Sequence, residues 1–265
     1  MLLRPSASIL RDAKPPWKSQ TISGKLEGAF LFTTAVAKNV VPFLLIEPLL
    51  VALPLVIREE NSAKRFEVVD HDEILNERFA SRWFAEAERL WNKHRTDKAK
   101  RSEMTYLNRL DFQHGLTDQN PDARFIVLYT GSATDASAVV VDRTAFEAPF
   151  VAEHKTYWCE AKSESEAHFI CAYLNSGYAN EKIKDFQSRG LFGPRDIHKT
   201  IVKLPFPRFD PKNELHKSLA KLGSKCATRA SYSITSSARA MSESGMASPS
   251  ALAAPLFRTS SNRLA

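Results

Sequence analysis

The run at residues 40–57, VVPFLLIEPLLVALPLVI, constrains the fold of this chain more than any other stretch. It is long and apolar enough to suggest a membrane span, but Pro42, Pro48 and Pro54 interrupt it at six-residue intervals and Glu47 lies in its middle. A proline inside a helix removes a backbone hydrogen bond and costs about 3 kcal/mol, and a carboxylate in mid-bilayer costs about as much again. The run therefore predicts short buried strands separated by prolines, rather than a transmembrane helix.

The rest of the N-terminal part supports a β-rich structure with one amphipathic helix. Apolar or alternating runs predict strands at 30–34, 40–46, 49–53 and 66–69. Residues 72–95 predict a helix whose apolar stripe has three- and four-residue spacing, formed by Leu75, Phe79, Trp83, Ala87, Leu90 and Trp91. Tryptophans on such a stripe anchor a core more often than they stack on nucleic-acid bases, so we expect a core role for both.

The second half of the chain changes from strands to helices. Residues 124–130 and 136–142 predict a hairpin joined by GSATD, and residues 156–161 predict a further strand. Ser163 and Glu166 form a capping box before an apolar helical pattern, and Gly177 is expected to end that helix. A second helix is expected at 179–189, ended by Gly190.

The last predicted helix begins after an extended segment, KLPFPRF, at 203–209. Asp210 is expected to cap it, with Pro211 at its first position and Gly223 at its end. From Ala230 to the end, eighteen of thirty-six residues are Ser or Ala. Such a segment buries little apolar surface, so we expect a disordered low-complexity tail at 227–265. The fold expected is α+β over residues 1–226, with room for a subdivision near 145–160.

Charge is concentrated in one segment of the chain. Residues 182–229 contain twelve Lys and Arg against four Asp and Glu, a net charge of +8, whereas residues 1–181 contain twenty-two against twenty-five. A basic segment of this kind indicates an anionic partner such as nucleic acid, with a solvated helical face as the alternative.

The motifs of several enzyme classes are absent from the sequence. It contains no GxG turn for a dinucleotide or phosphate, no HxxxH or HExxH metal pair, and no GxSxG nucleophile. KPPW at 14–17 resembles the catalytic motif of amino-methylating enzymes, but its lysine has no acceptor for the substrate amine. Three widely spaced cysteines, and an N-terminus without an apolar signal core, predict a reduced, cytoplasmic setting.

Four motifs together suggest a family. They are a Ser-x-x-Glu-Ala helix ending in Leu-Asn-Ser at 163–176, QSRGLFGPRDIHK at 187–199, LPFPRFD at 204–210 and a His-x-x-Leu-Ala segment at 216–220. The chain resembles the C-terminal region of adenine-specific DNA methyltransferases of restriction–modification and related defence systems. The resemblance is good over 155–224 and looser towards residue 1.

The resemblance implies a target-recognition region that grips duplex DNA beside a separate methyltransferase core. S-adenosylmethionine is expected only in that core, whose cofactor-binding and catalytic motifs this chain lacks. We therefore expect no catalytic residue, no metal, no cofactor and no membrane partner in this chain, and a specificity module that is inactive alone. The alternative is a structural or interaction fragment without DNA affinity. The tail resembles translated insertion-element sequence, which suggests a truncated gene.

The loop at 187–199 carries most of the expected contacts. Lysines and arginines there would neutralise phosphates, and Gln187 or an arginine would reach a base edge. The expected DNA-binding residues are Lys182, Lys184, Gln187, Arg189, Arg195, Lys199 and Lys203. The expected structural turn consists of Gly190, Gly193, Pro194 and Asp196.

Several side chains of the same region are expected to have structural roles instead. An ion pair between Arg195 and Asp196 is an alternative to DNA contact by that arginine. Phe192 and Ile197 are expected to be buried anchors of the turn. His198 and His216 are expected to pack or cap rather than to bind a ligand.

Overall fold

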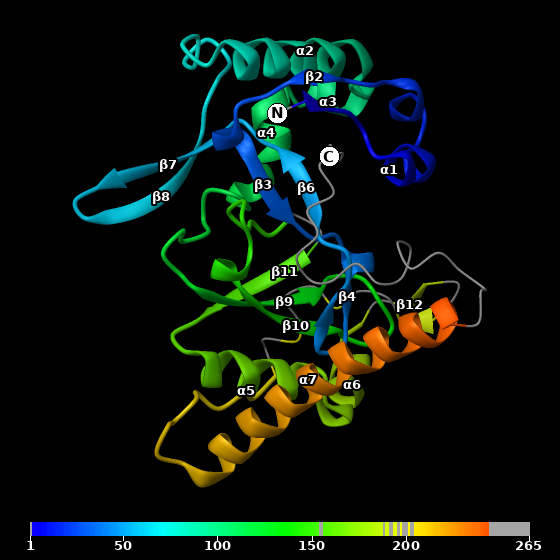
Figure 1. Cartoon of the computed structure of the whole chain (residues 1–265), viewed down its shortest axis with the longest axis vertical. Helices are drawn as coiled ribbons and strands as arrows, with labels where there is room; N and C mark the ends of the chain where they lie inside the picture. The colour runs from blue at the N-terminus through cyan, green and yellow to red at the C-terminus, as the bar shows by residue number, and fades with distance from the viewer. Residues whose placement is uncertain are drawn as a thin grey trace.

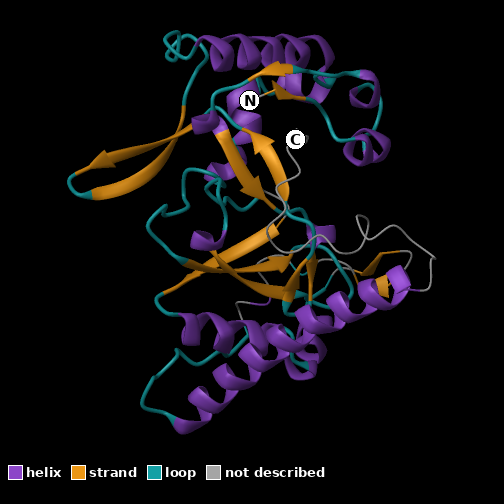
Figure 2. Ribbon diagram, viewed as in Figure 1, coloured by secondary structure: helices purple, strands orange, loops and turns teal. Residues whose placement is uncertain are grey.

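A computed structural model describes residues 2–153, 156–187, 189–190, 193–194, 197, 201 and 204–243. It contains both helices and strands, which confirms the α+β class (Figures 1 and 2). The strands are β1 (Leu2–Leu3), β2 (Gly24–Lys25), β3 (Leu31–Thr34), β4 (Val40–Val41), β5 (Leu44–Leu45), β6 (Leu49–Ala52), β7 (Leu55–Glu60), β8 (Ala63–Val68), β9 (Phe125–Thr130), β10 (Ala138–Asp142), β11 (Thr156–Ala161), β12 (Arg189–Gly190) and β13 (Gly193–Pro194). The helices are α1 (Ala7–Asp12), α2 (Arg78–His94), α3 (Asp97–Arg101), α4 (Tyr106–Leu110), α5 (Glu164–Leu174), α6 (Gly177–Lys184) and α7 (Glu214–Glu243).

The proline-interrupted run forms short strands separated by prolines, as predicted, but the single strand expected at 40–46 is divided by a turn at Pro42 and Phe43. It forms β4, β5, β6 and the start of β7, and each of Pro42, Pro48 and Pro54 lies in the connection between two successive strands. β6 pairs with β3, and β4 pairs with β5, both antiparallel. Among the described residues, no helix combines the length and apolar character needed to cross a membrane.

Helix α2 begins later than expected, at Arg78, and residues 71–77 form turns. The carboxylate of Glu27 accepts hydrogen bonds from the backbone N–H groups of Phe79 (3.0 Å) and Ala80 (2.7 Å), so a residue far away in the sequence caps this helix. Trp83 is buried, which confirms its core role, whereas Trp91 is only partly buried and does not have the core role expected of it. Leu75 and Phe79 do not belong to the buried stripe, because their side chains are exposed.

Two apolar layers enclose the sheet β10–β9–β11. β9 pairs antiparallel with β10 and with β11, which confirms the hairpin and the strand at 156–161. Side chains alternate along β9, so Val127 and Tyr129 face the core shared with α5 and α6. Ile126 and Leu128 face the opposite core, which they share with residues of β4 and β5. The N-terminal strands and the C-terminal helices therefore cover opposite faces of one sheet.

The capping box of α5 is confirmed, but the glycine after it has a different role. The Ser163 hydroxyl accepts a hydrogen bond from the Glu166 N–H at 3.2 Å, and the Glu166 carboxylate accepts one from the Lys162 N–H at 2.7 Å. Gly177 was expected to end this helix. It is instead the first residue of α6, because the preceding Ser176 caps a new helix by accepting from the Ala179 N–H at 3.1 Å.

The longest helix, α7, differs most from the expectation. Its first turn is capped by Asn213, whose side-chain oxygen accepts from the Leu215 N–H at 2.9 Å, and not by Asp210, which forms the preceding turn. The helix continues through Gly223. A side chain at this position would collide with the backbone oxygen of His168 in α5, so only glycine allows the two helices to pack this closely. Gly223 thus permits helix–helix contact and does not end the helix.

Residues 227–243, the first part of the expected tail, continue α7, and disorder of the tail remains a prediction. No proline or glycine occurs between Ser224 and Glu243, and alanine has the highest intrinsic helix propensity. Residues 244–265 lie outside the described part of the chain.

The expected subdivision near 145–160 remains a prediction. Within this range, the Pro149 carbonyl accepts from the Thr33 N–H at 2.8 Å, and the Val151 N–H donates to the Thr33 carbonyl at 2.9 Å. These bonds join the segment before β11 to strand β3.

Candidate nucleic-acid interface

Helix α6 presents the first two expected DNA-binding lysines at its surface. Ala179 and Ile183 are fully buried against the core of the sheet, which fixes the orientation of the helix. Lys182 and Lys184 are therefore exposed. The Lys184 ammonium lies 3.7 Å from an Asp135 carboxylate oxygen, whereas Lys182 has no ion-pair partner among the described residues. Lys182 is therefore more available than Lys184 for contact with a phosphate.

Two exposed aromatic side chains flank Lys182 at four-residue spacing. Tyr178, in α6, is 54% exposed, and Phe186, in the turn after α6, is 66% exposed. With Asp185, Leu204 and Pro205 they line a cleft of about 410 Å³. A surface of alternating aromatic and cationic groups can stack on bases and neutralise phosphates. The sequence analysis did not identify these two aromatic residues, although their four-residue spacing around Lys182 was visible.

Gln187 does not serve the role expected of it. The side chain is only 6% exposed, and its amide nitrogen donates hydrogen bonds of 3.2 Å to the carbonyls of Ala133 and Thr134. Both carbonyls belong to the β9–β10 turn. Gln187 therefore ties the start of the 187–199 loop to that turn, and a base edge cannot reach its buried amide without breaking these bonds.

The loop itself is described only in part. Arg189 and Gly190 pair antiparallel with Pro194 and Gly193, so three of the four expected turn residues lie in one short two-stranded ribbon. Ile197 is fully buried and its N–H donates to the Gly131 carbonyl at 3.1 Å, which confirms its anchoring role. The other expected residues lie outside the described part of the chain, namely Phe192, Arg195, Asp196, His198, Lys199 and Lys203.

Helix α7 adds a basic stripe that the expected site did not include. Lys217, Lys221, Lys225 and Arg229 follow one another at four-residue intervals and are all exposed. Lys217 pairs with Glu214 at 2.6 Å, but the other three have no ion-pair partner among the described side chains. At 1.5 Å per residue the stripe is about 18 Å long. Its spacing was visible in the sequence, but the expected end of the helix at Gly223 divided it.

His216, at the start of α7, is a packing residue as expected. Its ring centroid lies 4.8 Å from that of Phe169, and its Nδ1 accepts a hydrogen bond of 2.9 Å from the Asp210 N–H. The imidazole thus joins α5, α7 and the turn between Asp210 and Asn213.

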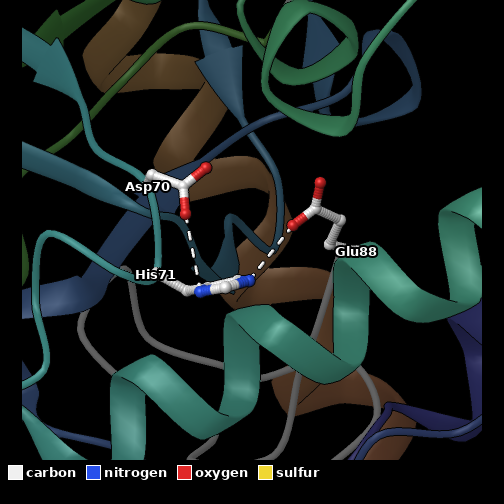
Figure 3. Close-up of side chains that lie close together, drawn as sticks. All are labelled: Asp70, His71 and Glu88. Atoms are coloured by element: carbon white, nitrogen blue, oxygen red, sulfur yellow. Dashed lines mark ion pairs between the residues drawn. The ribbon is translucent and has the colours of Figure 1, made fainter.

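One further cluster of polar side chains lies far from this surface, between the turn before α2 and α2 itself. His71 Nδ1 lies 3.5 Å from an Asp70 carboxylate oxygen, and His71 Nε2 lies 3.2 Å from a Glu88 carboxylate oxygen (Figure 3). Asp72 also approaches Nδ1, at 3.0 Å. Each ring nitrogen therefore faces a carboxylate, and Asp70, His71 and Glu88 each offer a possible metal-ligand atom within 4.8 Å of the others. Exposed acidic groups of this kind are common without a metal, so the cluster alone assigns no metal site.

Cys171, which is buried, and Cys159, which is half-buried, are poorly suited to nucleophilic chemistry. Burial raises the pKa of the Cys159 and Cys171 thiols to about 12, so both are protonated near neutral pH.

Comparisons with known proteins supply no family assignment. No protein-family model matches the chain, and no curated protein matches it. The likeness to the C-terminal region of adenine-specific DNA methyltransferases therefore remains a prediction, based on the four motifs. In the structure these motifs correspond to α5, the 187–199 loop, the extended segment before α7 and the first turns of α7.

Proposed function

We propose that this chain is a DNA-binding specificity module that contacts duplex DNA through α6, α7 and the loop between them. The observation that carries the proposal is the stripe on α7, where Lys221, Lys225 and Arg229 are exposed and have no ion-pair partner among the described side chains. Duplex DNA presents one negative charge per about 1.7 Å of its axis, so a row of cations about 18 Å long can meet several phosphates.

The location of the basic segment supports the same proposal. Helices α5, α6 and α7 gather at one end of the molecule, beyond the sheet β10–β9–β11 (Figure 1). The segment at 182–229 has a net charge of +8 and contributes the last turn of α6 and the first half of α7 to this end. Cations gathered in this way raise the local concentration of a polyanion and speed its association.

The aromatic side chains of α6 and of the turn that follows it extend the proposed contact beyond phosphates. Tyr178 and Phe186 stand on either side of Lys182 and are more than half exposed. Exposed rings of this kind stack on bases or enter base steps in nucleic-acid complexes. We assign the phosphate contacts to Lys182 and the α7 stripe, and contacts with bases to the two rings.

In the proposed role the module is not catalytic. The motif resemblance points to the specificity region of an adenine-specific DNA methyltransferase, in which a separate core binds S-adenosylmethionine and transfers the methyl group. The proposal assigns recognition to this chain and assigns both cofactor binding and chemistry to such a core.

Fluorescence anisotropy with labelled duplex DNA over a series of salt concentrations tests the proposal. The expected logarithmic salt slope decreases in magnitude by about 1.8 in the double variant Lys221→Glu/Lys225→Glu, because two phosphate contacts are lost. The matched control is Arg78→Glu/Arg82→Glu, which makes the same charge change at the same spacing on the exposed side of α2. No binding at low salt, or equal losses in the two variants, would contradict the proposal.

A second candidate function is that of an interaction fragment. Leu215 is 74% exposed and Leu222 is 55% exposed, and seven-residue spacing places them on one side of α7. Two exposed leucines on one helix face favour a protein partner. Sedimentation analysis of the wild-type chain and of Leu215→Ser/Leu222→Ser tests this candidate, since only the wild type should self-associate or bind a supplied methyltransferase core.

A further inference from the structure

A cleft of about 290 Å³ lies at the C-terminal end of α2, at the opposite end of the molecule from α7 (Figure 1). Four segments line it: the short 3-10 turn Trp17–Ser19, the end of α2 with the residues that follow, α3 with the residues after it, and α4. The side chains that define its chemistry are Trp17, Trp91, His94, Arg95, Lys98 and Arg109. A volume near 300 Å³ is at the lower end of the range found for small-molecule sites.

Aromatic rings form one wall of the cleft. The indoles of Trp17 and Trp91 are nearly parallel, with an interplanar angle of 15° and centroids 6.2 Å apart. The rings of His94 and Trp17 pack in a T-shaped arrangement, with their centroids 5.9 Å apart. Trp91 is held by a hydrogen bond of 3.4 Å from its indole N–H to the Met104 carbonyl. Trp17 remains 37% exposed, so a planar ligand can reach its ring.

Three cationic side chains also line the cleft, beside the uncharged Thr96, Ala99, Ser102 and Met104. Arg95, Lys98 and Arg109 contribute positive charge, and none of the described residues that line the cleft is acidic. Arg95 is oriented by a hydrogen bond of 3.1 Å from its guanidinium to the Met104 carbonyl. Lys98 is exposed and has no ion-pair partner among the described residues. The surrounding segment, residues 93–101, contains five Lys and Arg and one Asp, a local excess hidden by the net charge of −3 over residues 1–181.

Two buried polar atoms of the lining residues lack a partner. The Nε2 of His94 and the Nε of Arg95 have no hydrogen-bond partner in the described part of the chain. Most buried polar side-chain atoms in proteins are hydrogen-bonded, so each exception calls for an explanation. Both atoms lie beneath the accessible surface of the cleft, so the case for a ligand rests on the exposed ring and the cations.

We infer that this cleft is a second binding site, which takes a phosphorylated nucleoside. The base stacks on Trp17, and the phosphate meets Lys98, Arg95 and Arg109. Indole faces stack on any base, and the lysine and arginines neutralise the phosphate. This site is separate from the proposed duplex-DNA surface and does not depend on it. The same chemistry is found in a free nucleotide and in the 5′-phosphorylated end of a single strand.

Isothermal titration calorimetry on the full chain with adenosine 5′-monophosphate tests the inference. The variant Trp17→Ala should weaken binding about tenfold or more, because it removes the stacking surface. Lys98→Ala should weaken it several-fold. Adenosine lacks the phosphate and ribose 5-phosphate lacks the base. Each should therefore bind about tenfold more weakly than the complete nucleotide. The two sources are distinguished with a 5′-phosphorylated single-stranded oligonucleotide, which binds more tightly than the mononucleotide only if the site takes strand ends.

Two matched variants serve as controls. Phe79→Ala removes a ring of similar exposure on α2 that does not line the cleft, and Lys100→Ala removes a neighbouring charge of α3 that does not line it either. Both should bind the nucleotide as the wild type does. Absence of binding at millimolar concentration, or equal affinities of Trp17→Ala and Phe79→Ala, would overturn the inference. If Trp17→Ala fails to fold, the nucleotide affinities of Lys98→Ala and Lys100→Ala are compared instead. Equal affinities of these two variants would also overturn the inference. The α7 variant Lys221→Glu/Lys225→Glu should leave nucleotide affinity unchanged, which separates this site from the proposed DNA surface.

Discussion

Gly223 of α7 lies directly against the backbone of His168 in α5, so the two helices approach more closely than any side chain at position 223 would allow. A Cβ atom at Gly223 would collide with the His168 oxygen and would lie 3.2 Å from the Cβ of Ala172. This approach holds the basic stripe of α7 in a fixed orientation on α5. The contact therefore links the packing of the helices to the proposed DNA surface.

Replacing Gly223 with alanine should destabilise the protein. Overpacking of a close contact costs about 1–3 kcal/mol, and the better helix propensity of alanine offsets up to about 1 kcal/mol of this. We expect a net loss of about 1–2 kcal/mol in the free energy of unfolding, measured by urea denaturation. Gly177→Ala is the control, because a Cβ there meets no atom within 4 Å and should leave stability unchanged or slightly raised. Equal stability of the two variants would show that α5 and α7 do not pack in this way.

Replacing Gln187 with leucine separates an anchoring role from base recognition. The change removes the hydrogen bonds to the Ala133 and Thr134 carbonyls and should lower the free energy of unfolding by about 1–2 kcal/mol. Gln20→Leu is the control, because the Gln20 amide makes one exposed hydrogen bond of 3.4 Å to Ser19. Competition binding with several DNA sequences completes the test. A Gln187→Leu protein that stays fully stable but loses discrimination between sequences would restore the original expectation of base contact.

Asp142 should make stability depend on pH in the acid range. The Arg124 guanidinium, 2.8 Å away, and hydrogen bonds from Thr144 hold the pKa of Asp142 at about 2. The folded pKa is lower than the unfolded value of about 3.9, so the contribution is complete above pH ~4 and is lost as the pH falls towards 2. Because both groups are partly exposed, we expect it to be about 1 kcal/mol or less.

Urea denaturation at pH 7, 4 and 2 measures this contribution. Asp142→Asn should be less stable than the wild type at pH 7 and equally stable at pH 2. Arg124→Gln should remove most of the pH dependence of stability that Asp142 causes, since Arg124 is the main cause of the lowered pKa of Asp142. A constant difference between Asp142→Asn and the wild type at all three pH values would rule out the ionic contribution.

Features that depend on neighbouring residues were predictable from the sequence. The prolines at 42, 48 and 54 separate strands because the proline ring removes a donor and restricts φ wherever it occurs. The hairpin of β9 and β10 and the capping box of Ser163 also depend on residues a few positions apart. Burial of Trp83 followed from the periodicity of its own helix. In each of these cases the interacting groups belong to a single segment.

Features that depend on distant partners were not predictable in the same way. The start of α2 is set by Glu27, fifty-two positions before Phe79, and the passage of α7 through Gly223 is set by the backbone of α5. Glutamine is a residue type that can recognise a base. The Gln187 side chain is instead buried and hydrogen-bonded to the β9–β10 turn, more than fifty positions away in sequence. The cleft between Trp17 and Trp91 combines residues that the sequence separates by more than seventy positions.

The sequence by itself thus determined the α+β class, the strand breaks, the hairpin and the basic character of residues 182–229. Only the tertiary structure decided which cations form continuous surfaces and which polar side chains are buried. The physical reason is the range of the interactions. Backbone sterics and capping act within a few residues and are visible in the local pattern, whereas burial and helix–helix contact depend on which distant segments the fold brings together.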